Sequence, residues 1–225
     1  MNDLLVRAAG LTRQFGNGHD AVVAVAGATF EIREGDRIAL TGPSGSGKTS
    51  LLHLIAALDQ PSGGVIEWPA LGQAGDLRPG PVGIAFQGPS LLPPLTVAEN
   101  VALPALLAGS ADAAAATEAG ALIERLGLAE VASKLPEEIS GGQAQRAGLA
   151  RALVGRPRLI LADEPTGQLD RGSAVALIDV LLEHVTATPA ALVVATHDAA
   201  VAGRLPVHWS MSERILQTGA SPCTY

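Results

Sequence analysis

The segment Gly42-Pro43-Ser44-Gly45-Ser46-Gly47-Lys48-Thr49 decides the fold of this chain. It fits the pattern G-x-x-x-x-G-K-[S/T], in which glycines let the backbone wrap closely around an anion so that its N–H groups point at phosphate oxygens. The continuously apolar run 38–40 precedes the segment, and the apolar run 51–55 follows it. This order of strand, loop and helix is the context that the pattern requires. We therefore predict a phosphate-binding loop, strengthened by the partial positive charge of a helix N-terminus.

The residue types in the loop predict how a nucleoside triphosphate is held. Lys48 would reach the β- and γ-phosphates, and Thr49 would offer its hydroxyl to Mg²⁺. A glycine-rich turn that fits the pattern by chance is the alternative, and the flanking strand and helix count against it. The predicted nucleotide-binding residues in this segment are Gly42, Pro43, Ser44, Gly45, Ser46, Gly47, Lys48, Thr49 and Ser50.

Polar residues follow two further runs that read as strands buried on both faces. Asp163 and Glu164 come directly after the apolar run 159–162, and His197 follows a second such run. Asp163 would hold Mg²⁺ through water, while Glu164 is placed to polarise the attacking water. A neutral His197 imidazole could hydrogen-bond the γ-phosphate or that water. Because ligands lie beyond the carboxyl ends of parallel strands, we expect these residues to converge with Lys48, although Asp163-Glu164 alone would also suit a solvated turn.

Composition excludes several other classes of protein. The chain has 225 residues, 48% of them hydrophobic, so a sizeable core is possible. Fifteen Lys and Arg against 22 Asp and Glu give a net charge of −7, which argues against binding nucleic acid. The single cysteine, Cys223, cannot form an internal disulfide. We expect no signal peptide, because the first seven residues contain no basic stretch followed by an apolar run. We expect a soluble chain, because the longest uncharged stretch, 79–98, is too rich in proline to be a membrane helix.

The order of periodic segments indicates an α/β protein with a helical insertion. Alternating polarity over 21–32 is typical of a half-exposed antiparallel strand. Apolar residues recur at helical spacing from Ile178 to Val185, and the region 96–154 is mostly helical in pattern. The chain therefore begins with strands, continues as α/β, inserts helices and returns to α/β.

The segment Ser140-Gly141-Gly142-Gln143 precedes the helical run 144–154. By itself it is a helix N-cap with permissive glycines. It lies between the phosphate loop and Asp163, however, and with them the chain resembles the ATPase subunit of ABC (ATP-binding cassette) transporters over essentially its whole length. The motifs that match the family, in order, are Walker A at 42–49, a Gln loop at Gln87, the signature at 140–143, Walker B at 159–163, the catalytic Glu164, a D-loop at 168–170 and the switch His197.

The resemblance implies a fold and a domain organisation. The fold would be the α/β P-loop NTPase fold, with a RecA-like parallel sheet core, an N-terminal antiparallel β subdomain and a helical signature subdomain. Residues 1–225 would form a single ABC ATPase domain. Its core would comprise 1–87 and 158–225, and its helical subdomain 88–157.

The resemblance also implies a mechanism that needs two subunits. They would pair head to tail, with Ser140 and Gly142 capping the γ-phosphate held by the partner. The cofactors would be ATP and Mg²⁺, with Gln87 contacting the metal and the water. The catalytic residues would be Glu164, His197, Lys48 and Gln87, and the metal ligands Thr49, Gln87 and Asp163. Nucleotide-binding residues beyond the phosphate loop would be Ser140, Gly141, Gly142, Gln143, Asp170 and Phe15, the last stacking on adenine where the family usually has tyrosine.

The partners implied are an integral-membrane permease, docked near 88–105, and a second ATPase subunit, for which we expect a homodimer rather than a heterodimer. The chain would then lie at the cytoplasmic face of the inner membrane, held there by the permease. Nucleic acid is not expected as a partner.

Finer features point to one branch of the family. The segments 91–101 and 163–167, the latter ending in a glycine, look like those of the lipoprotein-release and macrolide-exporter ATPases, with the cell-division ATPase a near relative. Permeases of this branch transmit force rather than enclose a substrate. Gln168 departs from the asparagine usual in this branch, and the stretch 68–81 is shorter than usual.

Two alternatives stay open. One is a soluble ABC ATPase acting on DNA or ribosomes, which would need a long coiled coil or tandem cassettes. The other is an ATP-gated interaction module that barely hydrolyses, against which Glu164 and His197 count.

Overall fold

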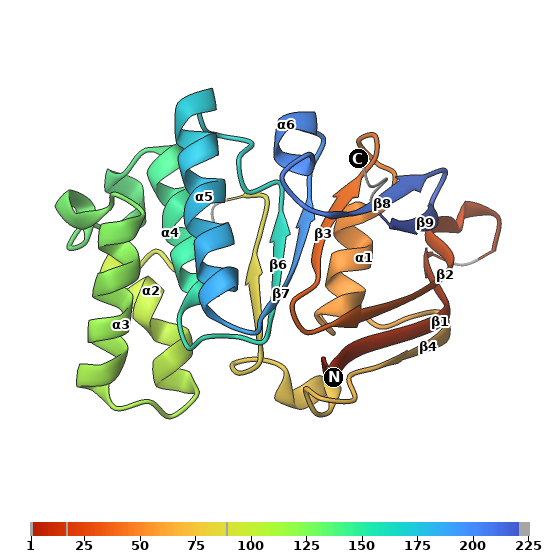
Figure 1. The fold of residues 1–225 in the computed structure, drawn as a ribbon, viewed down its shortest axis with the longest axis horizontal. Coiled ribbons are helices and arrows are strands. Elements are labelled where there is room, and N and C mark those ends of the chain that lie inside the picture. Colours follow the sequence, from red (N-terminus) through yellow and green to blue (C-terminus); the bar gives the residue numbers. More distant parts are fainter. Residues whose placement is uncertain (1, 17, 89, 221–225) are drawn as a thin grey trace. The chain divides into compact units, whose positions relative to one another are not determined.

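The computed structural model describes residues 2–16, 18–88 and 90–220, and Cys223 lies outside them (Figure 1). The chain divides into two compact units, one made of 1–77 and 191–225 and the other of 78–190. The division into a core of 1–87 with 158–225 and a helical subdomain of 88–157 stays a prediction. Among the described residues, no helix is both long and apolar enough to cross a membrane.

The first unit contains an antiparallel sheet, shown in Figure 1 by β1, β2 and β4 side by side. Its strands are β1 (Leu4–Phe15), β2 (Val22–Arg33) and β4 (Gly63–Glu67), in the order β2-β1-β4. The antiparallel strand predicted over 21–32 is thereby confirmed by β2, which pairs with β1. Apolar side chains such as Val6, Phe30 and Ile32 are buried on one face.

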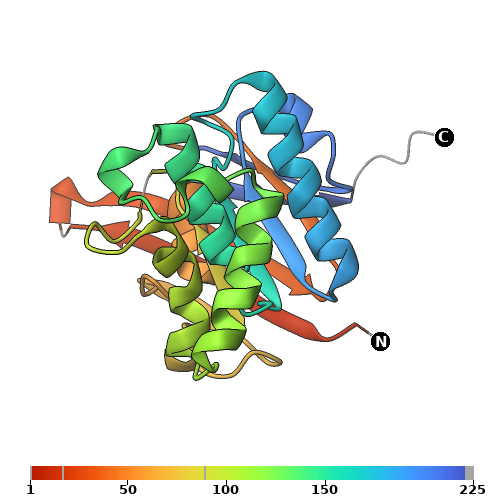
Figure 2. The same ribbon diagram turned by 90° about the vertical axis from the view of Figure 1, so that its left-hand side faces the viewer.

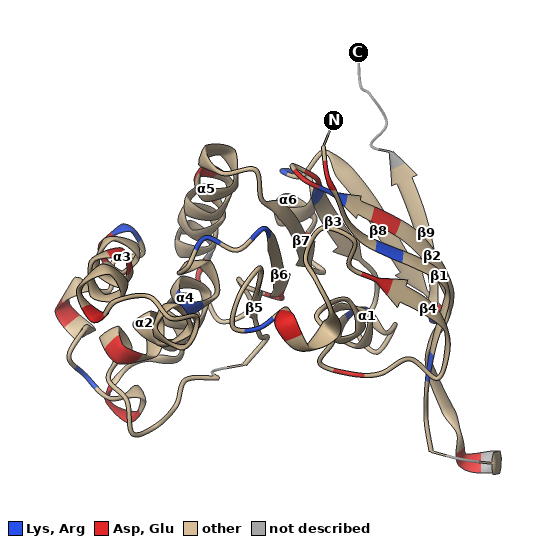
Figure 3. Cartoon of the chain, turned by 90° about the horizontal axis from the view of Figure 1, so that it is seen from below, with Lys and Arg blue, Asp and Glu red and all other residues tan. Residues whose placement is uncertain are grey.

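The charged residues of this sheet pair with one another. Figure 3 shows basic and acidic positions interspersed along its strands. Arg7 and Arg33 both contact the Glu31 carboxylate, at 3.1 and 2.7 Å. Hydrogen bonds from Arg33 and then from Arg7 lower the pKa of Glu31. The sheet surface here therefore presents mixed charge rather than a field of one sign.

The first unit also holds the strands that carry the phosphate loop. The strand β3 (Arg37–Thr41) lies parallel to both β7 (Ala191–Ala195) and β8 (Val207–Ser212), and β9 (Ile215–Ala220) pairs antiparallel with β8. Every residue of β7 and the centre of β3 are buried, as predicted from their continuous apolar runs. The short helices of this unit are α1 (Lys48–Ile55), α6 (Ala199–Ala202) and the 3₁₀ turns Gly18–Asp20 and Ala74–Asp76.

The second unit combines two parallel strands with the helical insertion. The strands are β5 (Val82–Ala85) and β6 (Leu159–Asp163). The helices are α2 (Val97–Leu107), α3 (Asp112–Arg125), α4 (Gly141–Leu153) and α5 (Arg171–Ala187), with 3₁₀ turns at Ala129–Val131 and Pro136–Glu138. In Figure 2, α2, α3 and α4 lie together, and each packs on the other two. The mostly helical region predicted over 96–154 is confirmed.

A buried asparagine fixes the loop that follows β5. Asn100 is fully buried on α2, and its Oδ1 accepts a hydrogen bond from the Leu92 N–H at 2.7 Å. Its Nδ2 donates to the carbonyl oxygens of Leu92, Leu95 and Thr96 at 2.9 to 3.1 Å. Arg151 holds the start of the same loop by donating to the Ser90 carbonyl oxygen at 2.7 Å. This loop is thus tied to both α2 and α4.

We expect Asn100→Ala to destabilise the protein by about 2–4 kcal/mol, because buried backbone groups of the loop lose their partners. Chemical denaturation followed by circular dichroism measures this loss. Ser110→Ala, at an exposed serine beyond the end of α2, serves as the control and should change stability by less than about 0.5 kcal/mol. Equal stability of the Asn100 variant and the control would show that the loop does not depend on these bonds.

Candidate nucleotide site

The phosphate loop has a backbone path that only glycine permits at two positions. Gly42 has a φ of 145° and Gly47 a φ of 104°. A Cβ on Gly42 would lie 2.1 Å from the Met211 carbonyl oxygen, and one on Gly47 would lie 2.0 Å from the Ala24 carbonyl oxygen. Both distances are far below van der Waals contact. The loop is therefore seated against β8 and β2 so closely that no side chain fits.

The polar groups of the loop fit an anionic ligand. Lys48 is buried, with 7% of its surface exposed, and its Nζ donates to the carbonyl oxygens of Gly42 at 2.8 Å and Pro43 at 3.2 Å. The Ser46 hydroxyl is buried without a hydrogen-bond partner. Since buried polar atoms are rarely left unsatisfied, this hydroxyl suits a ligand oxygen. The helix α1 begins directly after Gly47 with no acidic residue in its first turn, so nothing in that turn repels an anion at its N-terminus.

His197 lies at the same edge of the sheet as the phosphate loop. In the parallel pair of β3 and β7, Leu40 faces Ala195, and the Thr196 N–H donates to the Leu40 carbonyl oxygen at 3.0 Å. The loop and His197 therefore leave neighbouring strands at their carboxyl ends, and the His197 side chain is exposed. Within this unit, the structure places Lys48 and His197 at one edge of the sheet, as expected from the sequence.

The second unit brings Gln87 to the same edge as the acidic pair. Ala85 of β5 faces Ala162 of β6 in a parallel register. Gln87 follows β5 as an exposed residue, while Asp163 and Glu164 follow at the end of β6 with 4% and 8% of their surfaces exposed. Asp163 belongs to a different compact unit from Lys48, so its convergence with the phosphate loop stays a prediction.

The signature segment forms the capped N-terminus of α4. The Ser140 Oγ accepts from the Gln143 N–H at 3.3 Å, and the Gln143 Oε1 accepts from the Ser140 N–H at 2.8 Å. This reciprocal pair is a capping box, and it confirms the N-cap that the sequence predicted. Ser140 and Gly141 are exposed, so the start of this helix is accessible from solvent. Roles for Gly142 and Gln143 at a nucleotide stay predictions.

Asp170 is the N-cap of α5. Its carboxylate accepts from the N–H groups of Gly172 at 2.9 Å and Ser173 at 3.0 Å, and from the Ser173 hydroxyl. The Ser173 hydroxyl and N–H lower the pKa of Asp170 because they stabilise its charged form. The structure thus gives this carboxylate a capping role, and its place in the nucleotide site stays a prediction.

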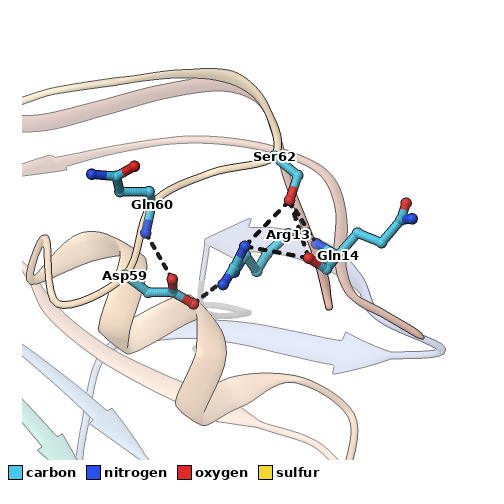
Figure 4. A network of polar contacts seen from close by, with 5 residues as sticks. All are labelled: Arg13, Gln14, Asp59, Gln60 and Ser62. Carbon is cyan, nitrogen blue, oxygen red and sulfur yellow. Dashed lines mark hydrogen bonds and ion pairs between the residues drawn. The ribbon is translucent and has the colours of Figure 1, made fainter. Parts of the chain in front are cut away.

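Phe15 presents a half-exposed ring with a cation on one face. The Arg13 guanidinium carbon lies 4.3 Å from the ring centroid. Figure 4 shows how Arg13 is held: its Nε lies 2.7 Å from the Asp59 Oδ2, and its Nη1 donates to the Ser62 hydroxyl at 3.4 Å. A cavity of about 500 Å³ is lined by Arg13, Gln14, Phe15, Gly16 and Ser62. The exposed part of the Phe15 ring suits a planar base.

Sequence reasoning missed Gln145, which is buried on α4 with 7% of its surface exposed. Its Nε2 donates to the Glu164 carbonyl oxygen at 2.9 Å, and its Oε1 accepts from the Gln168 N–H at 3.0 Å. The sequence signal that could have found Gln145 is its helical spacing from the apolar Leu149 and Ala152, which places this polar residue on the apolar face of the helix.

Comparison with known proteins identifies the family. The family model described as "ABC transporter" matches residues 25–167, which is more than half of the chain. This chain belongs to the ABC transporter ATP-binding family. An ABC ATPase binds ATP and hydrolyses it, and its fold is the α/β P-loop NTPase fold expected from the sequence.

Curated relatives of this ABC ATPase carry the name lipoprotein-releasing system ATP-binding protein LolD. The protein of that name from Legionella pneumophila (strain Paris) is 41% identical over 212 residues, covering 91% of this chain and 93% of the relative. The one from Shewanella oneidensis is 36% identical over 228 residues, covering 98% and 99%. These matches confirm the resemblance to the lipoprotein-release branch.

A solved structure similar to this ABC ATPase is a dimeric ATP-binding cassette in a post-hydrolysis state, bound to ADP and Pi. It superposes with a TM-score of 0.89 at 28% sequence identity, covering 96% of this chain and 98% of that one. A dimeric bacterial ABC transporter cassette superposes equally well. The fold of this chain is thus that of the ABC cassettes.

We expect Gly47→Ala to lower the affinity for ATP by at least about 100-fold, because its Cβ would displace the loop from Ala24. Gly45→Ala is the matched control, since a Cβ there would meet nothing within 4 Å. The φ of +74° at this position costs the Gly45→Ala variant about 1–2 kcal/mol of strain, so its affinity for ATP should fall by no more than about tenfold. Isothermal titration calorimetry with ATP compares the two, and similar affinities would contradict the role assigned to close packing at Gly47.

Proposed function

We propose that this chain is the ATP-hydrolysing subunit of a membrane assembly of the exporter or force-transmitting type, and that it works as a head-to-tail dimer. The observation that carries the proposal is the exposed, capped start of α4, in the same unit as the buried Glu164. An accessible helix N-terminus suits a phosphate held by another subunit. The lipoprotein-releasing systems named for its relatives make a lipoprotein the favoured substrate of the assembly.

Each predicted site residue then has a chemical task. Lys48 and the N–H groups at the start of α1 would hold the β- and γ-phosphates, and Ser46 would donate its orphaned hydroxyl. Mg²⁺, held by Thr49, Gln87 and Asp163, would neutralise the charge of the phosphates.

Water activation would fall to the residues at the ends of β6 and β7. Glu164 would orient the attacking water and accept its proton, and His197 would hydrogen-bond the γ-phosphate. Phe15 would stack on adenine, with Arg13 behind its ring.

The dimer would place Ser140 and Gly142 of one copy on the γ-phosphate bound by the other. Two features support this arrangement. The first turn of α4 carries no acidic residue, so nothing in that turn repels an anion. The similar solved structures are themselves described as dimeric cassettes. We propose that the dimer consists of two copies of this chain.

The permease would dock near residues 88–105, at the cytoplasmic face of the membrane. The loop there is held rigidly by Asn100 and Arg151, which suits a segment that transmits force. Beside it, a cavity of about 520 Å³ is lined by apolar residues of β5, α2 and the end of α4, together with Arg78, Arg151 and Arg156. An apolar surface of this kind fits a short amphipathic helix of a permease.

We expect Glu164→Gln to form a stable dimer with ATP and Mg²⁺, because the site is retained while water activation is lost. Size-exclusion chromatography with light scattering measures this, with ADP as the control nucleotide. A variant that binds ATP and stays monomeric would contradict the ATP-linked dimer.

We expect Ser140→Arg to bind ATP with nearly wild-type affinity while its turnover falls at least about 100-fold, because the bulky cation blocks capping of the partner's phosphate. Ser133→Arg, at another exposed serine of the same unit, is the matched control and should hydrolyse ATP normally. Phosphate release and ATP titration give the two quantities. Normal turnover by the Ser140 variant would refute capping between subunits.

A further inference from the structure

Gln145 connects α4 to the backbone at Glu164 and at Gln168, two positions of the second unit that belong to separate sequence motifs. It sits one turn into α4, beyond the signature, and its two amide groups reach the backbone of Glu164 and of Gln168 at 2.9 and 3.0 Å. The bond to Glu164 is buried, and the bond to Gln168 is partly buried, since Gln145 is buried while Gln168 is exposed. Hydrogen bonds of this kind are costly to break without replacement.

The backbone that Gln145 holds is strained. Glu164 has a φ of +46°, a left-handed conformation that is strained for a residue with a side chain. Its carbonyl oxygen accepts from Gln145 and also from the Gly167 N–H at 3.1 Å. These two bonds fix the orientation of the peptide that follows the catalytic carboxylate. Strain that surrounding contacts maintain is a common way of pre-organising a reacting group.

The signature segment and the D-loop are packed against each other at the same place. A Cβ on Gly141 would lie 2.6 Å from the Gln168 Oε1, and one on Gly142 would lie 3.0 Å from the Leu169 Cδ2. The two glycines thus let the D-loop approach the start of α4 closely. A displacement of α4 that carries Gln145 with it would strain or break the bonds to the Glu164 and Gln168 backbone.

We propose that Gln145 is a positioning residue that sets the catalytic carboxylate of Glu164 from the signature helix of the same chain. This inference rests on the proposed function, in which the signature of one copy contacts the nucleotide of the other. In such a dimer, Gln145 connects capping at one ATP to water activation at the second. Gln145 itself does not touch the substrate.

The test compares Gln145→Met, a near-isosteric change that removes both hydrogen bonds, with Gln60→Met at an exposed glutamine. Steady-state ATP hydrolysis by the full chain gives kcat and KM, and calorimetry gives ATP affinity. We expect kcat of the Gln145 variant to fall about 10- to 100-fold, the range for a reacting group displaced by about 1 Å, with ATP affinity within threefold of wild type. Gln60→Met should match wild type in all three quantities.

A double variant separates catalysis from assembly. Glu164→Gln combined with Gln145→Met should still form the ATP-dependent dimer, because the signature and the phosphate loop are intact. If Gln145→Met does not fold, Gln145→Asn, which keeps an amide but is too short for both bonds, takes its place and should show the same loss of kcat.

Two results would overturn the inference. One is a kcat equal to that of wild type, and the other is a fall in kcat matched by an equal loss of ATP affinity or of the dimer. Failure of the proposed function can be told apart from failure of this inference. It would appear as absent ATP hydrolysis by the wild type or as absent dimerisation of Glu164→Gln.

Discussion

Close approach of the phosphate loop to its neighbouring backbone is the constraint on which the rest of the site depends. Gly42 and Gly47 lie where a Cβ would overlap the carbonyl oxygens of Met211 and Ala24. That seating places Lys48 and the first N–H groups of α1 at the carboxyl end of β3, beside the end of β7. In the proposed site, a ligand with phosphate groups would meet N–H donors, an ammonium and the Ser46 hydroxyl at this edge of the sheet.

Buried amides perform a comparable task in the second unit. Asn100 fixes the loop after β5 through four hydrogen bonds, and Gln145 fixes the peptide after β6 and the start of the D-loop. Each satisfies backbone groups that neither a helix nor a strand could satisfy. The position of the Glu164 backbone and of the loop at 92–96 is therefore determined by buried amide side chains.

Around Phe15, too, a predicted ligand-binding side chain is positioned by neighbours that do not contact the ligand. The pairing of Arg13 with Asp59 places a cation against Phe15, and the ring keeps 44% of its surface exposed. A rigid, half-exposed ring binds a planar base at little entropic cost, because little motion remains to be lost. The ion pair therefore acts on the predicted adenine site through the ring and without contacting the base.

The sequence alone was enough to predict the chemistry of the site, because short-range patterns carry that prediction. The phosphate loop, the acidic pair after β6, His197 and the capped start of α4 could all be read from motifs and buried runs, as could the family. It did not reveal β5, β8 and β9, whose short or mixed-polarity runs give no clear period. Only the tertiary structure decided that Gln145 holds Glu164, that Arg13 lies behind Phe15 and that Asn100 holds the loop at 92–96. Gln145 lies 19 and 23 residues from its partners, and Arg13 is held by Asp59, 46 residues away. Asn100 bonds to nearby backbone, most of it in an irregular loop. Neither a distant partner nor an irregular loop leaves a period that can be read along the chain.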